Sequence, residues 1–253
     1  MAGPGDGATQ VPAVDASTVM LLRDAATDSV EVLLLRRHPR SKGFAGAYVF
    51  PGGKVSDADR QLDESCWRTR CLHTKREELG ADTEEDALGF LVAAVRETFE
   101  EAGVLLAQRH DGSRLTQDDL DGPAFSNARA QLVSRDTGWS WNDWVRRQRL
   151  VIDLDALWMW SWWVTPVHLP YRFDTRFLVT AVPETQCPSL DRVETTDMRW
   201  SSPEHALQDH HNGLIELRNP TIRNLQSLLR FDSVPDVLGA ARRGEIDSRC
   251  IQA

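Results

Sequence analysis

The chain has 253 residues, of which 41% are hydrophobic, and a formal net charge of −9. This length and composition allow one substantial hydrophobic core, and we expect a single elaborated domain. The acidic balance disfavours a surface that binds nucleic acid, because such surfaces neutralise many phosphates with clustered Lys and Arg. Four cysteines are too few for a disulfide framework, and no apolar run approaches the ~20 residues that span a bilayer. We therefore expect a cytoplasmic protein that binds neither membrane nor nucleic acid.

The first fourteen residues are rich in Gly, Ala and Pro without periodicity, so we predict a flexible tail over 1–14 and a single domain over 15–253. Two β-prone runs, at 17–22 and 30–35, open this domain. A short β-prone triplet then leads into Pro51-Gly52-Gly53, where two glycines permit a tight turn and a close approach to a ligand. This turn is a candidate edge of a site.

A long amphipathic helix is predicted from residue 87 to residue 102. Thr83 and Asp86 have the spacing of a capping box at its start, and Gly103 is suited to end it. Apolar residues recur along the helix at spacings of three and four, and they are Leu88, Leu91, Val92, Val95 and Phe99. We therefore expect one face of this helix to pack on the core.

Two polar stretches, at about 55–82 and 108–150, interrupt the pattern of strands and helices, and we predict that they are helical insertions. Tryptophans follow through 158–163, where their alternation favours packing in a buried strand over stacking on a nucleobase. Another strand is predicted at 177–182 and another helix at 219–230. Strands and helices are thus interleaved, which predicts an α/β layered domain.

The predicted helix carries a cluster of three acidic side chains. Glu97, Glu100 and Glu101 stand at positions i, i+3 and i+4, so their carboxylates share one face. Anions at this spacing repel one another, and a bound cation is the natural compensation. Carboxylate oxygens suit Mg²⁺ or Mn²⁺ better than they suit a soft metal. On an arbitrary helix, the alternative is a solvated acidic face balanced by Arg96.

The residues around the glutamates form a longer pattern. Arg96-Glu97 is followed by Glu100-Glu101, then by Gly103-Val104, with Gly52-Gly53 upstream. This pattern resembles the two halves of the Nudix box. The resemblance implies a Nudix-type α/β/α sandwich with a mixed β-sheet, to which the helical insertions are added. It also implies a metal site formed by the three glutamates and the Gly53 carbonyl, with Arg96 paired to a carboxylate of the box.

The resemblance includes an interruption of the box. The family's arginine usually lies fourteen residues after the first glycine, whereas Arg96 lies 43 residues after Gly53, an excess of 29. Leu88 occupies the position eight residues before the arginine, where the family usually has a glutamate. We therefore expect the first carboxylate of the box to be missing. Glu194 is a candidate supporting base, because related hydrolases often draw one from a loop outside the box.

The interrupted box, and the chain from Ser17 onward, resemble the coenzyme A diphosphatase-type Nudix proteins. An upstream motif of that group is matched by Leu33, Leu34, Arg37, Lys42, Gly46 and Phe50. The resemblance implies a pyrophosphohydrolase that splits coenzyme A or acyl-coenzyme A, with Arg37, Lys42 and Arg176 binding the substrate. For Arg37 and Lys42 the alternative is a solvated basic loop, and for Arg176 it is an ion pair with Asp174.

Two other functions stay open at this point. One is an ADP-ribose or NADH pyrophosphatase with the same chemistry, and the other is a non-catalytic Nudix-fold protein that binds a ligand or acts as a scaffold. In the enzymatic cases the partner is a small nucleotide derivative. The sequence is compatible with a homodimer.

Overall fold

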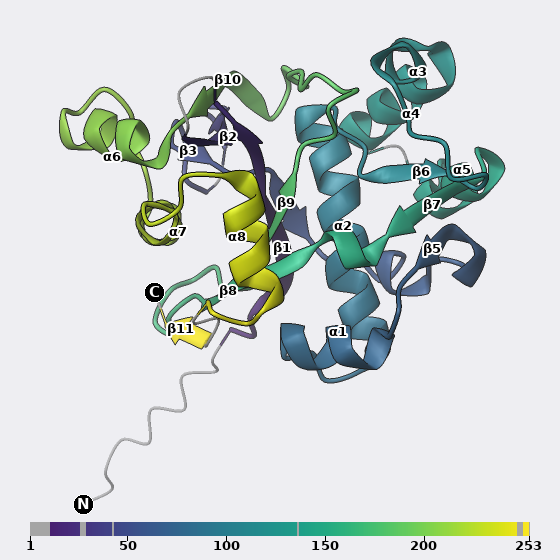
Figure 1. Cartoon of the computed structure of the whole chain (residues 1–253), viewed down its shortest axis with the longest axis horizontal. Helices are drawn as coiled ribbons and strands as arrows, with labels where there is room; N and C mark the ends of the chain where they lie inside the picture. The colour runs from purple at the N-terminus through teal and green to yellow at the C-terminus, as the bar shows by residue number, and fades with distance from the viewer. Residues whose placement is uncertain (1–10, 26–28, 42, 136, 247–249, 253) are drawn as a thin grey trace, which may run out of the picture.

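The computed structural model describes residues 11–25, 29–41, 43–135, 137–246 and 250–252, and Figure 1 shows its elements in space. The β-strands are β1 (Val14–Asp24), β2 (Val30–Arg37), β3 (Tyr48–Val49), β4 (Gly52–Lys54), β5 (Trp67–Arg68), β6 (Ala107–Arg109), β7 (Leu150–Asp153), β8 (Trp158–Val164), β9 (Phe173–Ala181), β10 (Thr195–Ser201) and β11 (Cys250–Gln252). The α-helices are α1 (Leu72–Leu79), α2 (Glu84–Ala102), α3 (Gln117–Asp121), α4 (Pro123–Ser134), α5 (Trp141–Arg147), α6 (Pro203–His211), α7 (Asn219–Leu228) and α8 (Val234–Arg242).

The main sheet has the strand order β10-β2-β1-β9-β8-β11, with β3 paired to β2 and β4 paired to β1. Strand β1 runs parallel to β9, and β8 runs parallel to β11, whereas the other pairs are antiparallel. The mixed sheet implied by the resemblance is therefore confirmed. The pairing of β4 with β1 places Gly53 opposite Ser17, which holds the Gly-Gly turn against the centre of the sheet.

Both faces of the sheet are buried. Successive side chains of a strand point to opposite faces, so each strand supplies side chains to a core on either side of the sheet. On β1, Val19 and Leu21 belong to the core cluster that includes α2, whereas Met20 and Leu22 belong to the cluster that includes residues of α6, α7 and α8. All four side chains are fully buried. Figure 1 shows α2 and α8 on either side of the strands, so the α/β/α sandwich is confirmed.

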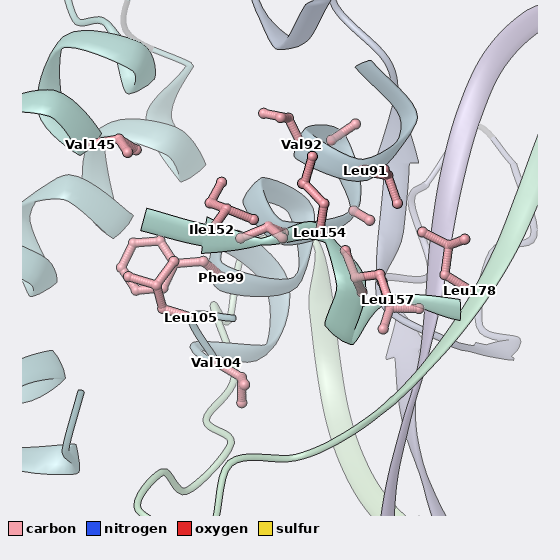
Figure 2. Packing of buried hydrophobic residues seen from close by; sticks show 14 of the residues in the cluster. Leu91, Val92, Phe99, Val104, Leu105, Val145, Ile152, Leu154, Leu157 and Leu178 are labelled. Carbon is pink, nitrogen blue, oxygen red and sulfur yellow. The ribbon is translucent and has the colours of Figure 1, made fainter. Parts of the chain in front are cut away.

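Helix α2 ends at Ala102 as predicted and begins at Glu84, three residues before the predicted start, directly after the N-cap of the predicted capping box. Thr83 accepts a hydrogen bond from the Asp86 amide, and the Asp86 side chain accepts one from the Thr83 amide, so the capping box is complete. Gly103 ends the helix in the left-handed conformation, at φ 67°. Figure 2 shows Leu91 and Phe99 from α2 among the buried side chains of β7, β9 and the adjoining loops. This packing fixes the helix that carries the glutamates.

The two predicted insertions contain regular structure. The first holds β5 and α1, and the second holds α3, α4 and α5. Strands β5, β7 and β6 form a second, three-stranded sheet beside α2. Trp141, Trp144 and Trp160 are buried, and the ring of Trp144 stacks on Phe99 with 5.8 Å between ring centroids. The prediction that the tryptophans pack in the core holds for these side chains.

Strand β1 begins at Val14, the last position of the range predicted to be a flexible tail. Residues 1–10 of that range lie outside the described residues. In the part of the chain that the structure describes, no helix is long and apolar enough to cross a membrane.

Candidate active site

The second half of α2 faces the Gly-Gly turn, where Gly53 lies against Glu97 of the helix and Gly52 lies against the main chain of β1. The carboxylate atoms of Glu97 lie 2.4 to 2.6 Å from the point where a Cβ on Gly53 would stand. A Cβ on Gly52 would lie 2.3 Å from the Ser17 carbonyl oxygen of β1. The Gly52 amide donates a hydrogen bond of 3.0 Å to Oε2 of Glu101. The turn therefore brings its main chain against two of the three predicted glutamates.

Arg96 joins the turn to the helix, as the resemblance implied. Its Nη1 donates to Oε1 of Glu97 at 2.7 Å, and its Nη2 donates to the Lys54 carbonyl at 2.9 Å. Nη1 also lies 3.8 Å from Oε2 of Glu100. The Arg96 side chain is 12% exposed, and its hydrogen bonds connect the Gly-Gly turn to the helix.

The first carboxylate of the box is present, which corrects the prediction that it is missing. Asp59 lies six residues after Gly53, is 1% exposed, and receives Nε and Nη2 of Arg96 at 2.8 Å each. Counting back from Arg96 reaches Leu88, because the extra residues lie between Asp59 and the arginine. Counting forward from Gly53 would have found it. The insertion thus separates two residues that the fold brings together again.

The three glutamates are poorly compensated in charge. Burial raises the pKa of Glu97, and it raises the pKa of Glu100 to about 7 with a further contribution from the charge of Glu97. Burial and the charge of Glu97 also raise the pKa of Glu101 well above its ordinary value. Arg96 is the cation in contact with this group, and it is already paired with Asp59.

The donor set fits a hard divalent cation. Carboxylate oxygens on one face of a helix, beside the main chain of a turn, are the ligands that Mg²⁺ and Mn²⁺ prefer. Within the described residues, no group of three His, Cys, Asp or Glu side chains already converges on one point. Glu97 is turned toward Arg96 and Glu101 toward the Gly52 amide, which are the donors available to them. A cation would draw these carboxylates together.

A fourth acidic side chain, Glu194, lies near the cluster on the loop between β9 and β10. Its charge contributes to raising the pKa of Glu97, Glu100 and Glu101, which places it within electrostatic reach of all three. Its carboxylate forms an ion pair with Arg135, from the second insertion. The sequence-based choice of Glu194 as a supporting group is therefore consistent with its position.

Of the three basic residues predicted to bind substrate, the structure describes Arg37 and Arg176. Arg37 is half-buried at the end of β2, where its Nε donates to the Gly43 carbonyl at 3.1 Å. Its positive charge partly offsets the rise in the pKa of Glu101, so Arg37 lies near the glutamates. Lys42 lies outside the described residues.

Arg176 is packed against Trp162 and paired with Asp174, as in the alternative that the sequence left open beside a substrate contact. Only 3% of the residue is exposed, and its guanidinium lies 3.9 Å from the ring centroid of Trp162. Its Nε donates to the Leu79 carbonyl at 2.6 Å, and it forms an ion pair with Asp174. These contacts hold the guanidinium between the sheet and the end of α1.

Known proteins are similar to this chain in sequence and in fold. A family model described as the NUDT19 Nudix domain matches residues 61–228. The chain is 32% identical over 244 residues to the acyl-coenzyme A diphosphatase NUDT19 of Gallus gallus, an alignment that covers 82% of this chain and 63% of the relative. It is 30% identical over 261 residues to the Homo sapiens protein of the same name, with 88% and 68% covered.

A solved structure agrees with these matches. The crystal structure of a NUDIX hydrolase from Alicyclobacillus acidocaldarius has a TM-score of 0.75 and 26% identity, and the comparison covers 90% of this chain and 96% of that one. The chain therefore belongs to the Nudix hydrolase family. Within that family, the domain that it matches is that of NUDT19. The chain spans 63% of the length of the Gallus gallus relative.

Proposed function

We propose that the protein is a divalent-metal-dependent pyrophosphohydrolase that splits coenzyme A or acyl-coenzyme A into 3′,5′-ADP and 4′-phosphopantetheine or its acyl form. One observation carries the proposal: three glutamates, of which Glu100 and Glu101 are buried and Glu97 is 14% exposed, share a helix face beside a Gly-Gly turn, with Arg96 as the compensating cation in contact with them. The relatives named as acyl-coenzyme A diphosphatases support the choice of substrate. The upstream motif, in which Arg37 lies near Glu101, supports it as well.

The side chains have distinct tasks in this reaction. A divalent cation held by Glu97, Glu100, Glu101 and the Gly53 carbonyl would polarise the diphosphate and lower the pKa of an attacking water. We propose Mg²⁺ or Mn²⁺ for this role, because the donors are hard oxygen atoms. Arg96 keeps Glu97 and the turn in fixed relation through its bonds to both.

Proton transfer and phosphate binding fall to other groups. Glu194 lies outside the box and is a candidate to take up the proton of the water. The Arg37 guanidinium is positioned to contact a phosphate of the substrate, since phosphate suits its planar set of donors. Lys42, four residues before the motif's Gly46, is proposed for the same task on the basis of its sequence position.

Further proposals concern the extent of the domain, its location and its partners. We propose a single domain over 15–253 that acts on a small nucleotide derivative in the cytoplasm and does not bind nucleic acid or membrane. The overall charge of −9 supports the absence of a nucleic-acid surface. A homodimer stays a prediction to be checked by light scattering.

The proposal is tested by measuring Mg²⁺-dependent release of 3′,5′-ADP from coenzyme A with three variants of α2. Glu100→Gln and Glu101→Gln are expected to lower kcat by at least about a hundredfold while the circular dichroism spectrum is unchanged. Glu85→Gln, on the exposed first turn of the same helix, is the control and should keep full activity. Full activity in both site variants would overturn the metal-site assignment.

A product-resolved screen separates the substrate classes. Coenzyme A, acyl-coenzyme A, ADP-ribose and NADH are incubated with the wild-type protein and Mg²⁺ or Mn²⁺, and kcat/KM is compared. A preference for ADP-ribose or NADH would support the proposed pyrophosphate hydrolysis and would contradict the choice of coenzyme A as the substrate. Binding of metal and nucleotide without turnover of any of the four would favour the non-catalytic alternative.

A further inference from the structure

The C-terminal end of α2 is held by an arginine from the second insertion. Arg129, on α4, donates from Nε to the main-chain carbonyl of Glu100 at 2.9 Å and from Nη2 to that of Glu101 at 3.2 Å. The same guanidinium donates to Oγ of Ser189 at 2.7 Å and to its carbonyl at 2.6 Å. One side chain thus connects the main chain of two site glutamates to the loop between β9 and β10.

That loop is bonded to the exit of α2 along its length. The Ser189 amide donates to the Ala102 carbonyl at 2.8 Å. The buried Gln186 side chain forms two bonds with the main chain of Leu105, at 2.9 and 3.1 Å. Five residues after Ser189 the loop reaches Glu194. These contacts join the first part of the loop to the end of α2, and further along the loop the Glu194 amide donates to Oδ1 of Asp191 and its carbonyl accepts from the His38 amide.

Gly103 makes room for this arrangement. A Cβ at this position would lie 2.6 Å from Oγ of Ser189 and 2.7 Å from Nη1 of Arg129. The residue also has φ +67°, a conformation that L side chains rarely adopt. Gly103 therefore ends α2 and also leaves space for the guanidinium of Arg129.

The C-cap of α4 supplies a second contact with the loop. Arg135, at that C-cap, forms an ion pair with Glu194. We name Arg129 and Arg135 together the α4 clamp. Through the clamp, one short helix of the insertion holds both the carbonyls of Glu100 and Glu101 and the carboxylate of Glu194.

Electrostatics explains why an arginine suits this place. The last carbonyls of a helix lack partners within the helix and carry the negative end of its dipole. Here two of those carbonyls belong to residues that also carry buried carboxylates. A guanidinium offers several donors in one plane, so it satisfies carbonyls of two segments at once, which the single ammonium of lysine does less well.

We propose that Arg129 is a positioning residue, through which the 108–150 insertion fixes Glu100 and Glu101 in relation to Glu194. Arg129 bonds to the main chain of the glutamates and leaves their carboxylates available. Its loss is expected to loosen the last turn of α2 and to spread the carboxylates that share a cation. The inference rests on the proposed function for the role of these carboxylates.

The test compares Arg129→Met, Arg129→Lys and a control, Arg109→Met, in the full chain. Arg109 lies in the same insertion, where it forms an ion pair with Asp119. Binding of Mn²⁺ to the metal-free protein is measured by electron paramagnetic resonance, and kcat and KM for coenzyme A are measured with Mg²⁺. Arg129→Met should weaken Mn²⁺ binding and lower kcat by about tenfold or more each, with KM changed by less than about threefold.

Arg129→Lys should recover part of both losses, whereas Arg109→Met should match the wild type. Wild-type Mn²⁺ affinity and kcat in Arg129→Met would overturn the positioning role. If Arg129→Met does not fold, Ser189→Ala replaces it, and wild-type Mn²⁺ affinity in both Ser189→Ala and Arg129→Lys would overturn the role. A wild-type protein that hydrolyses none of the tested diphosphates, with Mn²⁺ binding still weakened by Arg129→Met, would refute the proposed function and support the clamp.

Discussion

Replacing the buried Asp59 by asparagine should destabilise the protein strongly. Asp59 accepts four hydrogen bonds of 2.8 Å, two from Arg96 and two from the amide and hydroxyl of Ser56. Asparagine keeps one acceptor oxygen, replaces the other by a donor, and leaves the buried Arg96 with Glu97 as its remaining close anion. Removing one partner of a buried ion pair costs about 3–5 kcal/mol, and the retained acceptor points to the lower end, about 3 kcal/mol.

A loss of about 3 kcal/mol corresponds to a fall in Tm of roughly 6–12 °C for a domain of this size. The free energy of unfolding is measured by urea denaturation, and Tm by circular dichroism. Asp57→Asn is the matched control, because Asp57 lies two residues away with its side chain fully exposed. If the two variants unfold within about 1 kcal/mol of each other, the pairing of Asp59 with Arg96 does not hold the box together.

Three further outcomes follow from the site. With metal chelated, the free energy of unfolding, measured by urea denaturation, should fall from about pH 5 to pH 8, because the folded state retains a proton on Glu100, whose pKa is about 7. Glu100→Gln should make this fall smaller, and the part that remains is assigned to Glu97 and Glu101, whose pKa values are also raised. Gly53→Ala should lower kcat by about tenfold or more by displacing Glu97, while Gly43→Ala, with no atom near its added Cβ, should not. Arg176→Lys should lower Tm and leave KM unchanged; a raised KM would restore the substrate contact.

The elements predicted from the sequence are those whose signals are local. The capping box at Thr83 and the left-handed Gly103 are set by residues within one turn of each end of α2, and the structure has both. The spacing of Glu97, Glu100 and Glu101 likewise needs only the helical period. Local chemistry was sufficient for the helix and for its acidic face.

The contacts that were missed join residues far apart in the chain. Asp59 meets Arg96 across the insertion, and its place in the box is apparent only when the count begins at the glycine. Arg129 acts on main-chain carbonyls, for which no side-chain pattern exists in the sequence. For Arg176 the sequence allowed both substrate binding and an ion pair with Asp174, and its contacts with the neighbouring strand and with the end of α1 have no signal in the sequence.

The pairing of Asp59 with Arg96 also bears on how the insertion can change in length. The two ends of the 36-residue excursion between them are pinned to each other, so its contour length does not alter the distance across the site. For a flexible segment, each doubling of such a closed loop costs only about 0.6 kcal/mol of chain entropy. The exposed parts of this excursion are therefore a tolerant place to graft a peptide tag or a small reporter domain.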